Sequence, residues 1–164
     1  MKRKKTLIFI SIIVAAILSA GGTYLYAKIF GPQTVIQTNP DKVNCRQGNI
    51  FDGVARQARF TVLSTCEKVV GIVLNMKGTK EDDGDYQFNL DLEQPYQRLL
   101  NQVNDKQVRG MLVIEIIPKD QNSSLVQIPK NGDRIQAYGA WVTDNLAGGW
   151  NELHPAWKVK ILSV

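Results

Sequence analysis

The sequence is poor in the side chains on which most metal centres and nucleophilic active sites depend. Among its 164 residues there are one histidine and two cysteines. Zinc sites draw most of their three or four protein ligands from these residue types, so this chain can supply part of one at most. The pattern also shows no nucleophile with a matching general base. The composition therefore disfavours a transition-metal enzyme and contains no recognisable catalytic set.

Basic charge is also scarce beyond the N-terminus. The formal net charge is +5, and this excess comes from residues 2–5 and Lys28. The other 15 basic residues balance the 15 acidic ones, all of which follow Phe30. Nucleic-acid-binding domains show a basic face, because phosphate contacts dominate their affinity. The neutral domain therefore disfavours nucleic acid as a partner.

An uncharged run follows the basic cluster directly. Residues 6–27 carry no charge, and about 20 apolar residues cross a bilayer as a helix. We therefore expect a cytoplasmic tail at residues 1–5 and a single transmembrane anchor at residues 6–30. The positive-inside rule then places the rest of the chain outside the cytoplasm. A cleaved signal peptide is the alternative, but the run is long and lacks a convincing cleavage site.

A polar segment at residues 31–44 contains two prolines and is expected to form a stalk. Residues 45–164 then form one extracytoplasmic domain, long enough to bury a core. Cys45 and Cys66 make an even count in an exported domain, which predicts a disulfide; two buried free thiols are the alternative. Asn122 begins an Asn-Ser-Ser sequon in an expected loop, so it is a candidate glycosylation site.

Short alternating and β-branched runs after Cys45 predict a mainly β domain with one short helix. We expect strands at residues 58–63, 68–76, 86–92, 111–117, 134–142 and 156–162, and a helix at residues 95–103 that begins with Pro95. Gly71 inside the second strand suggests a bulge or a sharp coil. Counting the first strand separately places the helix after the third, which favours a small OB-fold-like β-barrel. An open β-sandwich is the competing architecture.

Three stretches together resemble a known group of proteins. They are Asp83–Tyr86, residues 132–144, and Trp150–Pro155, which reads W-x-E-L-H-P and is the most specific. The chain is similar, over about residues 60–164, to exported or membrane-anchored OB-fold-like proteins, including ones in ammonia-oxidising archaea. Relatives carry a histidine where this chain has Gln87, so a site made of that histidine and His154 would be broken here. The resemblance implies fold and location and no established activity.

The W-x-E-L-H-P stretch contains the best candidates for a site. On an extended segment Glu152 and His154 share a face, and Trp150 joins them. A glutamate and a histidine could act as an acid–base pair, although a loop histidine bonded to backbone is the favoured interpretation. Trp150 follows two glycines and is expected to be exposed, where it could stack on a sugar. We take these three residues as the candidate ligand-binding set, with Glu152 and His154 the only catalytic candidates.

Asp82, Asp83 and Asp85 crowd one turn. Clustered carboxylates are ligands that Ca²⁺ prefers, so this turn is a candidate metal site. The twelve-residue calcium-loop pattern is missing, which favours a solvated hairpin turn with no cofactor.

These observations favour a membrane-tethered extracytoplasmic module that binds a glycan, a peptide or an envelope protein, and is not an enzyme. One alternative is an accessory subunit of a membrane complex, because small residues at 15–16 and 19–22 could allow close helix packing. A second alternative is an extracytoplasmic hydrolase that uses Glu152 and His154.

Overall fold

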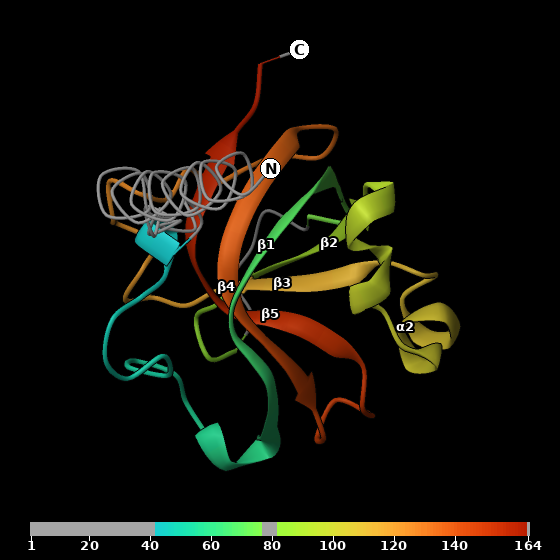
Figure 1. The fold of residues 1–164 in the computed structure, drawn as a ribbon, viewed down its shortest axis with the longest axis horizontal. Coiled ribbons are helices and arrows are strands. Elements are labelled where there is room, and N and C mark those ends of the chain that lie inside the picture. Colours follow the sequence, from blue (N-terminus) through green and yellow to red (C-terminus); the bar gives the residue numbers. More distant parts are fainter. Residues whose placement is uncertain (1–41, 77–81, 164) are drawn as a thin grey trace, which may run out of the picture. The chain divides into compact units, whose positions relative to one another are not determined.

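Five strands form a closed barrel in the computed structural model, which describes residues 42–76 and 82–163 (Figure 1). The strands run β1-β2-β3-β5-β4 around the barrel. Their bounds are Phe60–Leu74 for β1, Tyr86–Leu92 for β2, Leu112–Ile116 for β3, Arg134–Asp144 for β4 and Asn151–Ile161 for β5. Neighbours are antiparallel except β3 and β5, which are parallel. The predicted mainly β barrel is confirmed, and the open sandwich is wrong.

The expected tail and anchor at residues 1–30 and most of the expected stalk lie outside the described residues. Within the part that the structure describes, every helix is too short or too polar to cross a bilayer. The last residues of the expected stalk form a short 3-10 helix, η1 (Lys42–Asn44), which packs on β5. The carbonyl of Asn44 accepts a hydrogen bond from Trp157 Nε1 at 3.0 Å, and Asn44 Oδ1 accepts one from Lys158 Nζ at 2.6 Å.

β1 is one strand of 15 residues where the sequence predicted two. β1 stays paired with β4 along most of its length, and the register shifts at two bulges, between Val62 and Ser64 and between Ser64 and Glu67. The bulges absorb the polar residues that separated the two predicted strands. With β1 continuous, the helical segment follows the second strand, so the count that placed it after the third is wrong.

Gly71 lies in regular register, so the expected bulge at this residue is wrong. It pairs with Leu92 of β2 on one side and Ile135 of β4 on the other. A Cβ atom at this position would lie 2.3 Å from the backbone oxygen of Asp91. The glycine is required because the backbones of β1 and β2 approach so closely here that no Cβ atom fits between them.

The helix predicted at residues 95–103 is split in two. A 3-10 helix, η3 (Gln94–Leu99), precedes a short α-helix, α2 (Gln102–Gln107), and another 3-10 helix, η2 (Gln57–Arg59), precedes β1. Asn101 separates η3 from α2, because its side chain accepts hydrogen bonds from the amides of Val103 and Asn104. A residue that caps a helix has an extended backbone, so η3 must end before it.

The core fills the barrel with alternating residues of all five strands. β3 is buried along its whole length. Trp157 is 5% exposed in a second cluster, and Trp141 is partly buried against the main core. The largest fully buried apolar side chains are Phe88, Leu90, Leu99, Leu112, Ile114, Ile116, Ile117, Ile135 and Leu153.

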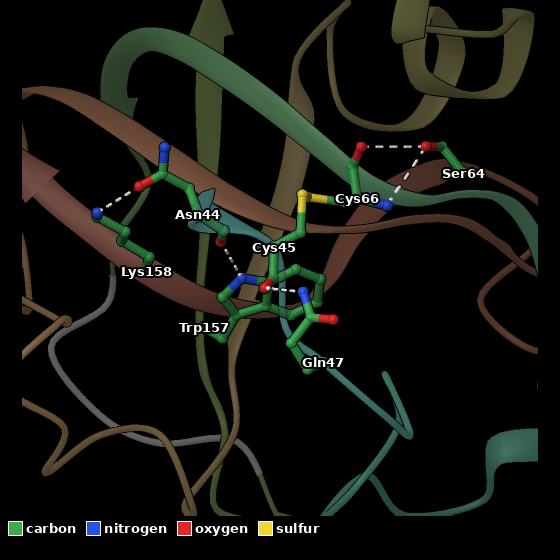
Figure 2. Close-up of a disulfide and its surroundings, with 7 residues drawn as sticks. All are labelled: Asn44, Cys45, Gln47, Ser64, Cys66, Trp157 and Lys158. Atoms are coloured by element: carbon green, nitrogen blue, oxygen red, sulfur yellow. Dashed lines mark hydrogen bonds between the residues drawn. A yellow bond between two sulfur atoms is a disulfide. The ribbon is translucent and has the colours of Figure 1, made fainter. Parts of the chain in front are cut away.

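The disulfide between Cys45 and Cys66 fastens the segment before the barrel to β1, which confirms its prediction (Figure 2). Figure 2 shows Asn44 on Trp157 and Lys158 directly beside the bridge. The N-terminal segment is therefore held by one covalent bond and by two hydrogen bonds to β5.

Candidate functional site

The seam that closes the barrel places three titratable side chains together. β3 and β5 pair through Val113 with Glu152 and Ile114 with Leu153. The next residue on β3 is Glu115, and β5 continues to His154. Glu152 is 0% exposed, His154 2% and Glu115 5%. Three groups that usually face water are therefore buried side by side, which costs free energy unless they compensate one another.

His154 contacts carboxylates through both ring nitrogens. Nδ1 lies 2.6 Å from Glu115 Oε2 and 3.2 Å from Glu152 Oε1, and neither contact is aligned as a hydrogen bond. Nε2 lies 3.7 Å from Asp85 Oδ2, and the ring packs 4.6 Å from that of Phe60. Glu152 and His154 do share a face, as expected. The interpretation of His154 as a loop residue bonded to backbone is wrong, because β5 begins three residues earlier than the histidine.

Each glutamate also accepts one hydrogen bond from a neutral donor. Gln87 Nε2 donates to Glu115 Oε1 at 2.6 Å, and Trp150 Nε1 donates to Glu152 Oε2 at 2.7 Å. Glu152 Oε1 is buried and has no hydrogen-bond partner. The position at which the resemblance implied a histidine thus belongs to this cluster, where Gln87 orients Glu115.

An arginine and an aspartate extend the cluster toward the surface. Arg59 Nη2 lies 3.0 Å from Asp144 Oδ2 and 3.7 Å from Glu115 Oε2. The guanidinium of Arg59 stacks over Phe60 at 4.6 Å. Asp144 is 1% exposed, and its other oxygen accepts hydrogen bonds from the amides of Leu146 and Ala147. Asp144 therefore shapes the β4–β5 loop and also fixes Arg59.

Negative charge is in excess in this cluster. Four buried carboxylates, those of Asp85, Glu115, Asp144 and Glu152, face the two cationic side chains of Arg59 and His154. A buried carboxylate without a counter-charge takes up a proton or attracts a cation.

The pKa values of the cluster reflect this excess. Burial raises the pKa of Asp85 to about 7, and the nearby Asp83 carboxylate adds to the rise. Burial also raises the pKa of Glu152, and it would raise that of Glu115, but contact with His154 outweighs it and lowers the Glu115 pKa. Burial alone would lower the pKa of His154, but Glu115 and Glu152 raise it to about 9. Charged His154 and Glu115 thus form the central ion pair at neutral pH.

An open pocket of about 470 Å³ lies above the cluster. Trp150 and the acidic turn both reach it, so the two candidate regions meet at one site. Trp150 is half-buried and not fully exposed as expected. Asp82 and Asp83 are exposed on the pocket rim, whereas Asp85 is buried against His154. The pocket is lined by Arg56, Arg59, Asp82, Asp83, Gln87, Glu115, Asp144, Leu146, Ala147 and Trp150.

Asparagines hold the start of β5 in place. Asn104 on α2 donates to the carbonyl of Asn151 at 2.8 Å and accepts from its amide at 3.0 Å. The Asn151 side chain donates to the Leu99 carbonyl at 2.9 Å and accepts from Thr143 Oγ1 at 2.8 Å. The residues on either side of Asn151 are Trp150 and Glu152, so this network sets the position of both.

Sequence reasoning missed Glu115, Asp144 and Arg59. Glu115 could have been noticed as the one charge in an otherwise apolar run at residues 111–117. Asp144 and Arg59 carry no such signal, because residues far apart in the chain bring them together. Asn122 is exposed in a turn, so the predicted loop around it is confirmed.

Comparison of the chain with family models, curated proteins and solved structures finds no match. Function is therefore inferred from the chemistry of the pocket and of the cluster beneath it.

Proposed function

We propose that this chain is a membrane-tethered, extracytoplasmic binding module whose pocket beside Trp150 takes a glycan. The strand order, with β5 between β3 and β4, supports an OB-fold-like barrel. Barrels of that kind bind oligosaccharides or oligonucleotides on strands 2 and 3, between the loops that follow strands 1 and 4. Gln87 on β2 and Glu115 on β3 line the pocket, as do Asp82 before β2 and Trp150 before β5. The pocket therefore lies where such barrels bind ligands.

The lining favours a sugar over a nucleic acid. Sugar rings stack on indole faces, and their hydroxyls pair with carboxylates, amides and guanidinium groups. The pocket offers Trp150 for stacking and Gln87 and Asp83 for hydroxyl groups. Its four acidic residues outnumber its two arginines, which disfavours a phosphate backbone. The presence of Trp150 at this pocket is the observation on which the proposal depends.

Glycan binding can be tested with the full chain in mild detergent. A glycan array selects a ligand, and calorimetry measures its dissociation constant. Trp150→Ala should weaken binding by about 10-fold or more, which is the lower part of the range of roughly 1–3 kcal/mol that a planar base gains by stacking on an aromatic side chain. Leu125→Ala removes a side chain that is 54% exposed and does not line the pocket, so it should leave the affinity unchanged. Capture of a peptide or an envelope protein with no glycan bound would contradict the proposal.

A hydrolase that uses Glu152 and His154 is the second candidate, favoured by the 3.2 Å contact between them. Both side chains are almost fully buried, so a substrate in the pocket meets Glu115 and Asp144 first. We therefore favour a module that binds its ligand without turnover over a hydrolase. Turnover of chromogenic glycosides or esters that disappears in Glu152→Gln would reverse this ranking.

A further inference from the structure

We propose that Glu115, Glu152 and His154 bind a divalent transition-metal cation beneath the pocket. The ligand atoms are Glu115 Oε2, Glu152 Oε1 and His154 Nδ1. This proposal does not depend on glycan binding, since none of its evidence comes from the pocket's affinity for sugars.

The two separations from His154 Nδ1 are close to those of neighbouring ligands on one ion. Metal–ligand bonds from histidine and carboxylate are about 2.0–2.2 Å long, so two adjacent ligands lie roughly 3 Å apart. Nδ1 lies 2.6 Å from Glu115 Oε2 and 3.2 Å from Glu152 Oε1. The ring N–H is not aligned with either oxygen. The 2.6 Å contact is also that of the ion pair between His154 and Glu115, so a bound cation would take the place of the proton on Nδ1.

Glu152 gives the independent evidence for a ligand. It is 0% exposed, and its Oε1 atom is directed toward Nδ1 without a hydrogen-bond partner. A buried carboxylate oxygen in this state costs free energy that a bound cation would offset. The surplus of buried carboxylates over cationic side chains calls for the same compensation.

The surrounding residues form the outer shell that such a site needs. Gln87 and Trp150 each hold the other oxygen of one glutamate, at 2.6 and 2.7 Å. Asp85 lies 3.7 Å from Nε2 of His154, and ligand atoms of Asp85, Glu115 and His154 fall within 4.8 Å of one another. A carboxylate that is hydrogen-bonded to the outer nitrogen of a ligating histidine orients the ring and raises its basicity, and Asp85 is the carboxylate next to that nitrogen here. Glu115 also lines the pocket, which gives an ion a path from solvent.

The donor set selects the class of metal. One imidazole nitrogen with carboxylate oxygens suits Mn²⁺, Fe²⁺ or Zn²⁺, whereas Ca²⁺ and Mg²⁺ prefer oxygen ligands alone. The site differs from the calcium site expected at the acidic turn, because the exposed Asp82 and Asp83 take no part in it.

Calorimetry on the full chain in detergent, after chelator treatment, tests the proposal with MnCl₂, ZnCl₂ and CaCl₂ as probes. We expect one Mn²⁺ or Zn²⁺ per chain and much weaker binding of Ca²⁺. Electron paramagnetic resonance of bound Mn²⁺ gives a second readout. Glu152→Gln should weaken binding by about 100-fold, and Asp85→Asn by about 10-fold, since outer-shell changes cost roughly 10–100-fold.

A double variant, Asp82→Asn with Asp83→Asn, is the matched control and should bind as the unaltered chain does. Thermal unfolding in chelator checks that each variant is folded, and Glu115→Gln replaces Glu152→Gln if the latter is not. No binding of Mn²⁺ or Zn²⁺ would overturn the proposal. So would Ca²⁺ as the sole ligand, or affinity that is lost in the double variant and kept in Glu152→Gln.

Discussion

The side-chain amide of Asn104, on α2, forms two hydrogen bonds with the backbone of Asn151, as the backbone of a neighbouring strand would. The Asn104 side-chain amide donates to the Asn151 carbonyl and accepts from the Asn151 amide, at 2.8 and 3.0 Å. It also donates to the carbonyl of Met111 at 2.9 Å. One buried side chain thus joins α2 to the residue directly before β3 and to the first residue of β5.

Replacing Asn104 by leucine should destabilise the barrel by about 3 kcal/mol or more. The change leaves a buried amide and two buried carbonyls without partners, and each costs on the order of 1–3 kcal/mol. Urea unfolding followed by tryptophan fluorescence measures the effect, because Trp141 lies on β4, Trp157 on β5 and Trp150 directly before β5. Gln102→Ala on the exposed side of α2 should change the stability by less than about 0.5 kcal/mol. Equal stability of the two variants would show that the Asn104 network is dispensable.

Stability should fall as the pH rises from about 4 to about 9. Between the ordinary pKa of 3.8 and its folded value of about 7, Asp85 holds a proton only in the folded state. His154 does so between 6.5 and about 9. The folded state binds more protons in both ranges, so raising the pH favours unfolding, by about 1.4 kcal/mol per pH unit for each proton. The raised pKa of Glu152 acts in the same direction.

One neighbouring group limits this pH effect. The lowered pKa of Glu115, which also faces the Arg59 guanidinium, acts in the opposite sense and removes stability as the pH falls below the ordinary value of 4.5. Urea midpoints in chelator across the pH range measure the trend. Asp85→Asn should flatten the part below about pH 7 and keep the decline above it. A stability that rises toward pH 9 would refute the ion pair of His154 and Glu115.

Removing the disulfide should cost about 3 kcal/mol. Cys45 and Cys66 are 21 residues apart, and closing a loop of that length restricts the unfolded chain by roughly this amount. The double variant Cys45→Ala with Cys66→Ala should therefore unfold at lower urea. The unaltered chain with a reducing agent should show a shift of similar size, while the reducing agent should not affect the variant. No difference between oxidised and reduced chains would contradict the prediction.

Gly71→Ala should destabilise the barrel by about 3 kcal/mol or prevent folding. The added Cβ would lie 2.3 Å from the Asp91 oxygen, which is backbone and held in the sheet, and overpacking costs roughly 1–3 kcal/mol even where neighbours can move. Thr65→Ala on the exposed part of β1 should stay within about 0.5 kcal/mol. A stable Gly71→Ala barrel would mean that β1 and β2 can separate at this crossing.

Local patterns predicted part of the fold and the site, and long-range contacts decided the rest. The alternation of Trp150, Glu152 and His154 is a property of one strand, so their shared face could be read directly from the sequence. Glu115 joins them only because β3 and β5 close the barrel, and no local pattern encodes that pairing. The helix break depends on a cap at Asn101, whose polar side chain looks unremarkable inside an amphipathic run.

The position of β5 has a consequence for assembly. The ribosome makes this strand after the other four strands of the barrel, yet in the barrel it lies between β3 and β4. Until β5 is synthesised and pairs with its neighbours, β3 and β4 each have an unpaired edge, and such edges form hydrogen bonds with strands of other chains. A nascent chain that lacks β5 is therefore prone to aggregate, and the insertion of β5 both ends that exposure and creates the buried acidic cluster.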